Sequence, residues 1–153
     1  MKKVLIALDY DPSAEKIAAI GHSIAKSQGA KVILLHVVAD AAYYSDMAYS
    51  PIMGFNGFIY PGIDEMLVKD LLQESHNFLE RSKEHLGDDQ IGILVKEGDF
   101  VTSILDTAKE EAVDLLVIGT HSRRGLDRLL NGSIAEKILQ QSDIPLLIIP
   151  NKE

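Results

Sequence analysis

Five short apolar runs alternate with segments of helical periodicity along this chain, and this alternation restricts the possible folds most. The runs cover residues 4–8, 31–38, 91–95, 115–118 and 145–149. They are apolar nearly throughout instead of alternating with polar residues, which is typical of strands that are covered on both faces. Strands that alternate with helices predict right-handed crossovers, and therefore an α/β fold with a doubly wound parallel sheet.

The helices between the runs are indicated by apolar residues at helical spacing and by signals at their ends. Asp11 is expected to cap a helix that begins at Pro12 and ends before Gly29. Further helices are predicted over residues 63–86, 100–112 and 133–141. In such folds a ligand binds beyond the carboxyl ends of the strands, where the strand order reverses, so residues 8–9, 37–38 and 118–119 are candidate positions.

The composition limits the class of protein. With 153 residues, 46% of them hydrophobic and 25% charged, the chain is expected to form one domain over 1–153. It has no cysteine, so disulfides and thiolate metal sites are excluded. The net charge of −8 argues against partners such as nucleic acids and anionic membranes, which require clustered Lys and Arg. No stretch reads as a signal peptide or membrane span, and we expect a cytoplasmic protein.

One connection departs from this pattern. Residues 39–62 lack clear periodicity, yet they hold six of the chain's nine Phe and Tyr residues. A solvated linker is not so rich in aromatic residues. We interpret this segment as a lid or an interaction surface, the alternative being a loop that packs over its own core.

The segment after the fourth run has the features of a phosphate-binding loop. Gly119 ends the strand, where a missing side chain lets a ligand approach the backbone, and Ser133 after Gly132 is a natural helix N-cap. Exposed N–H groups and the positive end of a helix dipole converge at such a point, and Arg123 with two further arginines adds positive charge. The alternative is a structural connector, because Ser133-x-x-Glu136 is also a capping box.

The spacing in this loop resembles the ATP-binding signature of universal stress proteins, Gly-x-x-Gly-x9-Gly-Ser/Thr. Here it reads Gly119-x-x-Ser122, nine residues, then Gly132-Ser133. Residues 4–9, 32–38, 114–121 and 142–150 also look like strands of that family, so the resemblance covers the chain apart from 39–62. It implies a five-stranded parallel sheet with strand order 3-2-1-4-5, helices on both faces, and a homodimer formed through the C-terminal strand at Pro145 to Pro150.

The resemblance also implies a site for ATP, with any Mg²⁺ held through the phosphates. Asp9 and the Val37 backbone would meet the adenine, Gly119 would lie beside the ribose, and backbone N–H groups together with the Ser133 hydroxyl would hold the phosphates. The complete predicted site is Ala7, Leu8, Asp9, Val37, Gly119, Thr120, His121, Ser122, Arg123, Gly132, Ser133, Ile134 and Ala135.

Ser122 stands where the signature has glycine. If this position requires a positive φ, serine costs about 1 kcal/mol and weakens binding by roughly fivefold. Two functions therefore compete. One is an ATP-binding regulatory module of the stress response with little or no turnover. The other is a nucleotide-free dimeric interaction protein of the same fold whose site is impaired by Ser122.

The signals for other chemistry are weaker, and we expect no enzyme, no catalytic residue and no metal site. No Walker motif occurs, and residues 9–13 contain no glycine for a dinucleotide fingerprint. An ATP pyrophosphatase would need a Ser/Gly-rich loop after the first strand, and residues 8–11 lack it. Asp9 and Asp11 could form a metal pair, but Asp11 is better used as a helix cap. His36 reads as a core histidine, whereas His121 could contact a phosphate or cap its loop.

Overall fold

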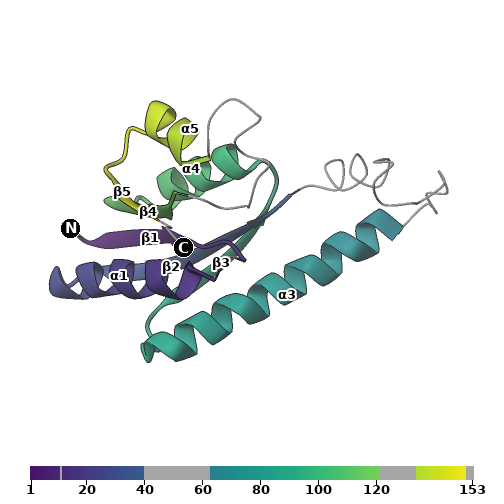
Figure 1. Ribbon diagram of the computed structural model, residues 1–153, viewed down its shortest axis with the longest axis horizontal. Helices are drawn as coiled ribbons and strands as arrows, with labels where there is room; N and C mark the ends of the chain where they lie inside the picture. The colour runs from purple at the N-terminus through teal and green to yellow at the C-terminus, as the bar shows by residue number, and fades with distance from the viewer. Residues whose placement is uncertain (11, 40–62, 121–133, 151–153) are drawn as a thin grey trace.

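The computed structural model describes residues 1–10, 12–39, 63–120 and 134–150. Strands and helices alternate along these ranges, as the apolar runs predict (Figure 1). The elements are β1 (Lys3–Ala7), α1 (Ala14–Ser27), β2 (Lys31–Val38), α3 (Ile63–Leu86), β3 (Gly92–Glu97), α4 (Phe100–Glu110), β4 (Leu115–Gly119), α5 (Ile134–Gln141) and β5 (Leu146–Ile149).

The five strands form one parallel sheet in the order β3-β2-β1-β4-β5. This confirms the fold class and the strand order that the resemblance implies. The central strand β1 pairs with β2 up to Ala7 opposite Leu35, and with β4 up to Ile6 opposite Val117. The sheet therefore reverses its winding between β1 and β4.

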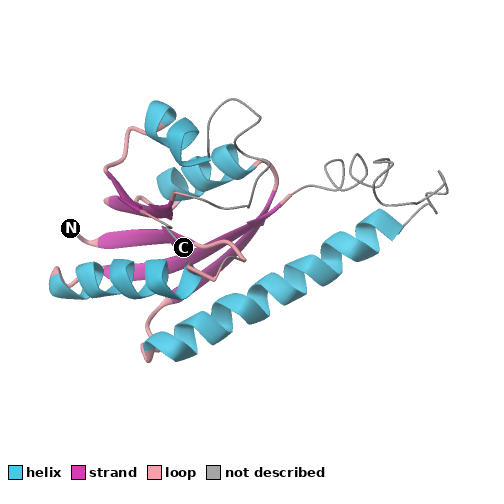
Figure 2. Ribbon diagram, in the orientation of Figure 1, coloured by secondary structure: helices cyan, strands magenta, loops and turns pink. Residues whose placement is uncertain are grey.

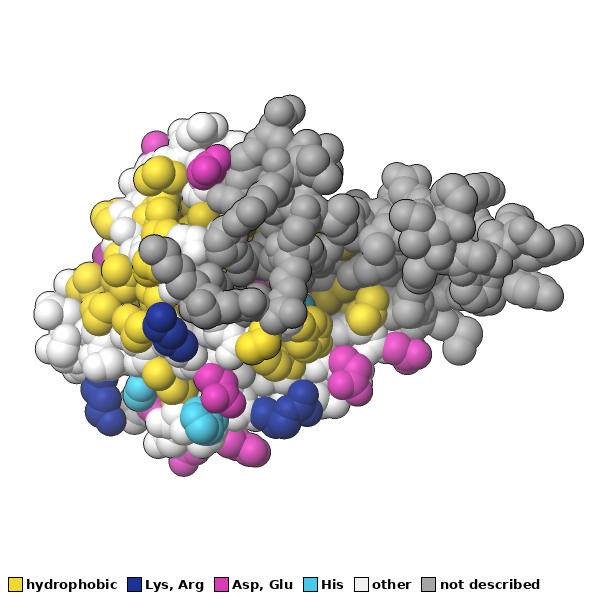
Figure 3. Space-filling view, in the orientation of Figure 1, with side chains coloured by type: hydrophobic (Ala, Val, Ile, Leu, Met, Phe, Trp, Pro, Cys, Tyr) yellow, Lys and Arg dark blue, Asp and Glu magenta, His cyan; other side chains and the backbone are white. Residues whose placement is uncertain are grey.

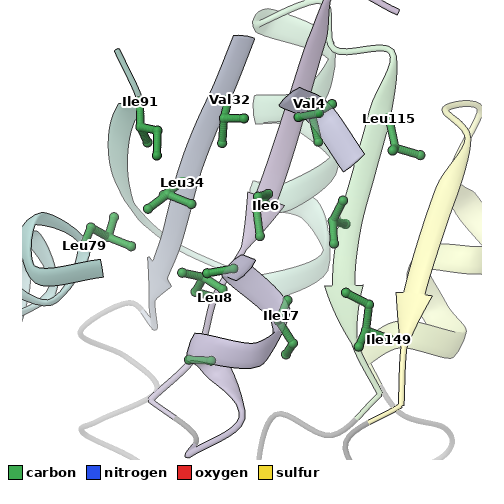
Figure 4. Packing of buried hydrophobic residues seen from close by; sticks show 14 residues of the cluster. Val4, Ile6, Leu8, Ile17, Val32, Leu34, Leu79, Ile91, Leu115 and Ile149 are labelled. Atoms are coloured by element: carbon green, nitrogen blue, oxygen red, sulfur yellow. The ribbon is translucent and has the colours of Figure 1, made fainter. Parts of the chain in front are cut away.

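Helices cover both faces of the sheet, with α1 and α3 on one face and α4 and α5 on the other (Figures 1 and 2). Side chains alternate between the two faces along each strand. Val4 and Ile6 of β1 therefore belong to the cluster under α1 and α3, while Leu5 packs in the cluster under α4 and α5. Figure 4 shows the first cluster, in which Ile17 of α1 lies over the strands.

Burial separates the central strands from the edges. All but the ends of β1, β2 and β4 are buried, as expected of continuous apolar runs. The edge strands β3 and β5 are mostly half-buried, because each has a neighbouring strand on one side only. The expected coverage of the strands on both faces is therefore found for β1, β2 and β4, and is incomplete for the edge strands β3 and β5.

Several predicted ends need correction. Helix α1 begins at Ala14 with Ser13 as N-cap, so the predicted start at Pro12 is wrong by two residues; Asp11 lies outside the described residues. Helix α4 ends at Glu110 instead of 112, because Ala112 adopts the left-handed conformation at φ 51°. Strand β3 covers 92–97 instead of 91–95, since it follows the longer β2 as far as Val38 opposite Glu97.

Candidate nucleotide site

A pocket lies beyond the carboxyl ends of β1, β2 and β4, at the place where the winding of the sheet reverses. In doubly wound sheets, the connections that follow two neighbouring strands run to opposite faces of the sheet at this point, and a crevice opens between them. Each of these strands contributes three consecutive residues to its lining: 7–9 at the end of β1, 35–37 of β2, and 118–120 at the end of β4. The remaining lining residues are Ala14 and Ile17 of α1, Phe100 and Ile104 of α4, and Ile134, Ala135 and Ile138 of α5.

All described residues of the predicted site line this pocket. They are Ala7, Leu8, Asp9, Val37, Gly119, Thr120, Ile134 and Ala135. The structure thus brings together residues from positions as distant in sequence as 7 and 135. His121, Ser122, Arg123, Gly132 and Ser133 lie outside the described residues, and their part in the site stays a prediction.

Backbone hydrogen bonds hold the strand ends that form the pocket. The Leu8 N–H donates to the Leu35 carbonyl at 2.8 Å and fixes the end of β1 against β2. On the other side, the Thr120 N–H donates to the Ile149 carbonyl at 3.1 Å and fixes the end of β4 against β5. The pocket is therefore built on the rigid sheet, which favours a preorganised site.

Asp9 is the acidic residue of the pocket. It follows Leu8 directly after β1, and its Oδ1 accepts a hydrogen bond from the Tyr10 N–H at 2.8 Å. A carboxylate has about four lone-pair positions and can accept from several donors at once. An ionised carboxylate accepts hydrogen bonds only, and it therefore favours a ligand with an N–H or amino group.

Several apolar residues of the lining are missed by the sequence-based prediction. Ile17, Ile104 and Ile138 come from three helices and close the pocket from both faces of the sheet. Each lies on the inward side of its helix, so helical spacing predicts that it is buried but does not show that it faces a ligand. His36 is also in the lining and is 4% exposed, which agrees with its interpretation as a core histidine.

The described residues include neither a cluster of metal-ligating side chains nor a membrane-spanning helix. They contain no group of three or more His, Cys, Asp or Glu side chains arranged to hold a metal ion. The weaker alternative of a metal pair at Asp9 and Asp11 cannot be followed in the structure, because Asp11 lies outside these residues. Among the helices described, none combines the length and the apolar character needed to cross a membrane.

The fold and the pocket define a doubly wound α/β protein with a pocket at its switch point, the place where the winding of the sheet reverses, and comparison with known proteins gives the family. Residues 1–150 match the universal stress protein family model. Universal stress protein MJ0577 of Methanocaldococcus jannaschii is 28% identical over 158 aligned residues, covering 99% of this chain and 96% of the relative. Universal stress protein YxiE of Bacillus subtilis is 31% identical over 153 residues, covering 96% and 97%. The chain belongs to the universal stress protein family.

Solved structures agree with this assignment. The structure of MJ0577 superposes with a TM-score of 0.74 at 25% identity, covering 99% of this chain and 97% of the other. A universal stress protein crystallised in complex with cAMP gives a TM-score of 0.63 at 18% identity, covering 97% and 95%. At that identity the second similarity concerns the fold alone.

Proposed function

We propose that this protein is an ATP-binding regulatory module of the stress response, acting in the cytoplasm with little or no turnover. The observation that carries the proposal is the pocket at the switch point, which is lined by every described residue of the predicted nucleotide site. A family member crystallised with cAMP supports an adenine nucleotide as the class of ligand.

The end of β2 suits an adenine base. Successive residues of a strand direct their N–H and C=O groups to alternate neighbours. The Leu35 carbonyl accepts from Leu8 in β1, so Val37 directs its own N–H and C=O to the same side, beyond the last paired residue of β1. Adenine presents an amino donor next to a ring-nitrogen acceptor, which matches a backbone C=O and N–H. The Asp9 carboxylate would add an acceptor for a base or ribose donor.

The phosphates would lie toward the start of α5. Ile134 and Ala135 occupy its first turn and line the pocket, so the positive end of the helix dipole faces the same space as Gly119. The predicted loop from His121 to Ser133 would add backbone N–H groups and the Arg123 charge. Because the chain carries a net charge of −8, these local groups must hold the anion against the average field of the protein.

Titration calorimetry with ATP, alone and with Mg²⁺, tests the proposal. ITP is the matched ligand because it lacks the amino group that the Val37 carbonyl would accept from, and we expect it to bind more weakly. Asp9→Ala should weaken ATP binding, whereas Asp89→Ala, which removes an exposed carboxylate at the other end of the sheet, should not. At a ligand concentration of about 100 times Kd, wild-type stability should rise by about 2.7 kcal/mol. Absence of heat, together with an unchanged Tm at millimolar ATP, would contradict the proposal.

We also propose that the protein is a homodimer paired through β5. This strand lies at the edge of the sheet, with Leu146, Leu147 and Ile148 half-buried. Figure 3 shows hydrophobic side chains gathered over β5 and the nearby end of α1, while acidic and basic side chains intermix along α3. An apolar edge invites pairing with another chain, and a twofold axis makes such a contact antiparallel and self-complementary.

A further inference from the structure

The ladder between β1 and β2 stops at the pocket, and side chains hold the two backbone groups that would continue it. With Ala7 opposite Leu35, the next step would place Asp9 opposite Val37. The Val37 N–H would then donate to the Leu8 carbonyl, and the Tyr10 N–H would donate to the Val37 carbonyl. Instead, the Leu8 carbonyl accepts from Nδ1 of His36 at 2.7 Å, and the Tyr10 N–H donates to Asp9 Oδ1 at 2.8 Å.

The His36 ring is fixed in the orientation that this hydrogen bond requires. A carbonyl oxygen only accepts, so the shared proton is on Nδ1. The ring is packed edge-on against Tyr10 with 4.6 Å between centroids, and against Phe78 of α3 at 5.8 Å. Burial of the side chain, which leaves His36 4% exposed, keeps water from competing for the Leu8 carbonyl.

Tyr10 connects this arrangement to α3. Its ring lies 4.8 Å from that of Phe78, and its hydroxyl donates to Ser75 Oγ at 3.1 Å. Ser75 in turn donates to the Leu71 carbonyl at 2.7 Å. These contacts hold Tyr10, which is 51% exposed, against α3 directly after Asp9.

We propose that His36 is a positioning residue of the nucleotide site. By occupying the Leu8 carbonyl it ends the β1–β2 ladder, and the Val37 N–H and C=O and the Asp9 carboxylate then face the base. If the pairing of β1 with β2 continued, the Val37 N–H and C=O would bond to β1, and the pocket would be closed on this side. The identity of the base rests on the proposed function, whereas the effect on the ladder is a property of the ligand-free protein.

Three variants test this inference. His36→Leu removes the donor, so the Leu8 carbonyl is left to the Val37 N–H. His36→Asn restores a donor, because its side-chain Nδ2 is the same number of bonds from the backbone as the histidine Nδ1. His22→Leu is the matched control: His22 is also buried, and its Nε2 pairs with Asp88 Oδ2 at 2.9 Å in a different part of the protein that shares no lining residue with the nucleotide pocket.

The first measurement is amide hydrogen exchange by NMR without nucleotide. Protection of the Val37 amide should rise in His36→Leu and stay at the wild-type level in His36→Asn and His22→Leu. The second measurement is affinity for ATP and ITP. His36→Leu should weaken ATP about fivefold or more and reduce the preference for ATP over ITP, while the other two variants stay within about twofold of the wild type.

The outcomes separate the two claims. If the wild type binds no adenine nucleotide, the proposed function is wrong, and the exchange data still decide whether His36 ends the ladder. If the wild type binds ATP but His36→Leu matches it in affinity, base preference and Val37 protection, the positioning role is wrong. Equal losses in His36→Leu and His36→Asn would also contradict it, because they would indicate a packing role for the ring.

Discussion

Gly21 of α1 lies directly against Ile6 of β1. A Cβ atom placed on Gly21 would be 2.7 Å from Ile6 Cδ1 and 3.0 Å from Ile6 Cγ1, closer than carbon atoms normally approach. It would also lie 3.3 Å from Val117 Cγ1 of β4. Helix α1 therefore packs on β1 and β4 through a residue without a side chain, and the same helix supplies Ala14 and Ile17 to the pocket.

Gly21→Ala should lower the free energy of unfolding by about 1 kcal/mol. Overpacking of a core costs about 1–3 kcal/mol, and the higher helix propensity of alanine offsets about 1 kcal/mol of this. Denaturant titration measures the change. Ile6→Val removes the Cδ1 atom that the new methyl would meet, so the double variant should lose less stability than the sum of the single variants. A Gly21→Ala protein as stable as the wild type would show that the contact is not tight.

Asp114 makes stability depend on pH at the amino end of the sheet. Its Oδ2 accepts hydrogen bonds from the backbone N–H of Lys2 at 2.6 Å and of Lys3 at 2.9 Å, which lower the pKa of the carboxyl below its ordinary value of 3.8. A lowered pKa means that the ionised form is favoured in the folded state. Its contribution is therefore present above about pH 3.8 and is lost as the pH falls through the lower, folded-state pKa.

Asp114→Asn should lower Tm at pH 7, and the difference from the wild type should shrink when the pH falls below 3.8. Thermal unfolding followed by circular dichroism between pH 7 and 3 measures this. Asp143→Asn, which changes an exposed carboxylate near β5, is the control and should show no such trend. A Tm difference that persists unchanged at the acid end would mean that the Asp114 charge is not the cause.

Ser122→Gly tests the departure from the family signature and separates the two candidate functions. If the position requires a positive φ, glycine should tighten ATP binding by roughly fivefold. Ser122→Ala removes the hydroxyl but keeps the Cβ atom, so it should not gain affinity. Titration calorimetry with ATP on the wild type, Ser122→Gly and Ser122→Ala measures these differences in affinity. Binding by the glycine variant alone would favour the nucleotide-free interaction protein, whereas tighter binding by Ser122→Ala would assign the effect to the hydroxyl.

Ile148→Pro tests pairing through β5. The carbonyls of Pro145 and Ile149 accept hydrogen bonds from β4, so the alternate residues Leu146 and Ile148 direct their N–H groups to the open edge. Proline at 148 therefore removes an outward donor and leaves the ladder with β4 intact. In sedimentation experiments we expect a dimer dissociation constant at least tenfold higher than that of the wild type, which corresponds to about 1.4 kcal/mol.

Ile148→Ala is the matched control for this prediction. It loses the side chain, which packs against the cluster under α4 and α5, but keeps the N–H. It should therefore lose stability while retaining more of the dimer than the proline variant. Equal dissociation constants for the two variants would place the dimer contact elsewhere, and a monomeric wild type would contradict the homodimer itself.

Sequence patterns predict the elements of this fold well where burial is continuous. Strand β2 and helix α3 have the predicted bounds, 31–38 and 63–86, because β2 is a continuous apolar run and α3 has a clear helical period that ends before Gly87. The ends of α1 and β3 are predicted less well. They depend on which backbone groups find partners in neighbouring elements, and no local residue pattern records those partners.

The sequence by itself determines the alternating α/β organisation and the resemblance of residues 119–133 to the family signature, and it predicts the site residues that follow strands. Only the tertiary structure decides how the strand ends meet. It places Asp9 and Gly119 in one pocket and adds the apolar side chains of α1, α4 and α5 to its lining. It also joins His36 to the Leu8 carbonyl, 28 residues away, and so ends a ladder that the apolar pattern alone would continue. The physical reason is that hydrogen bonds between distant segments form only once the sheet is assembled, and their partners are set by register instead of by neighbouring residues.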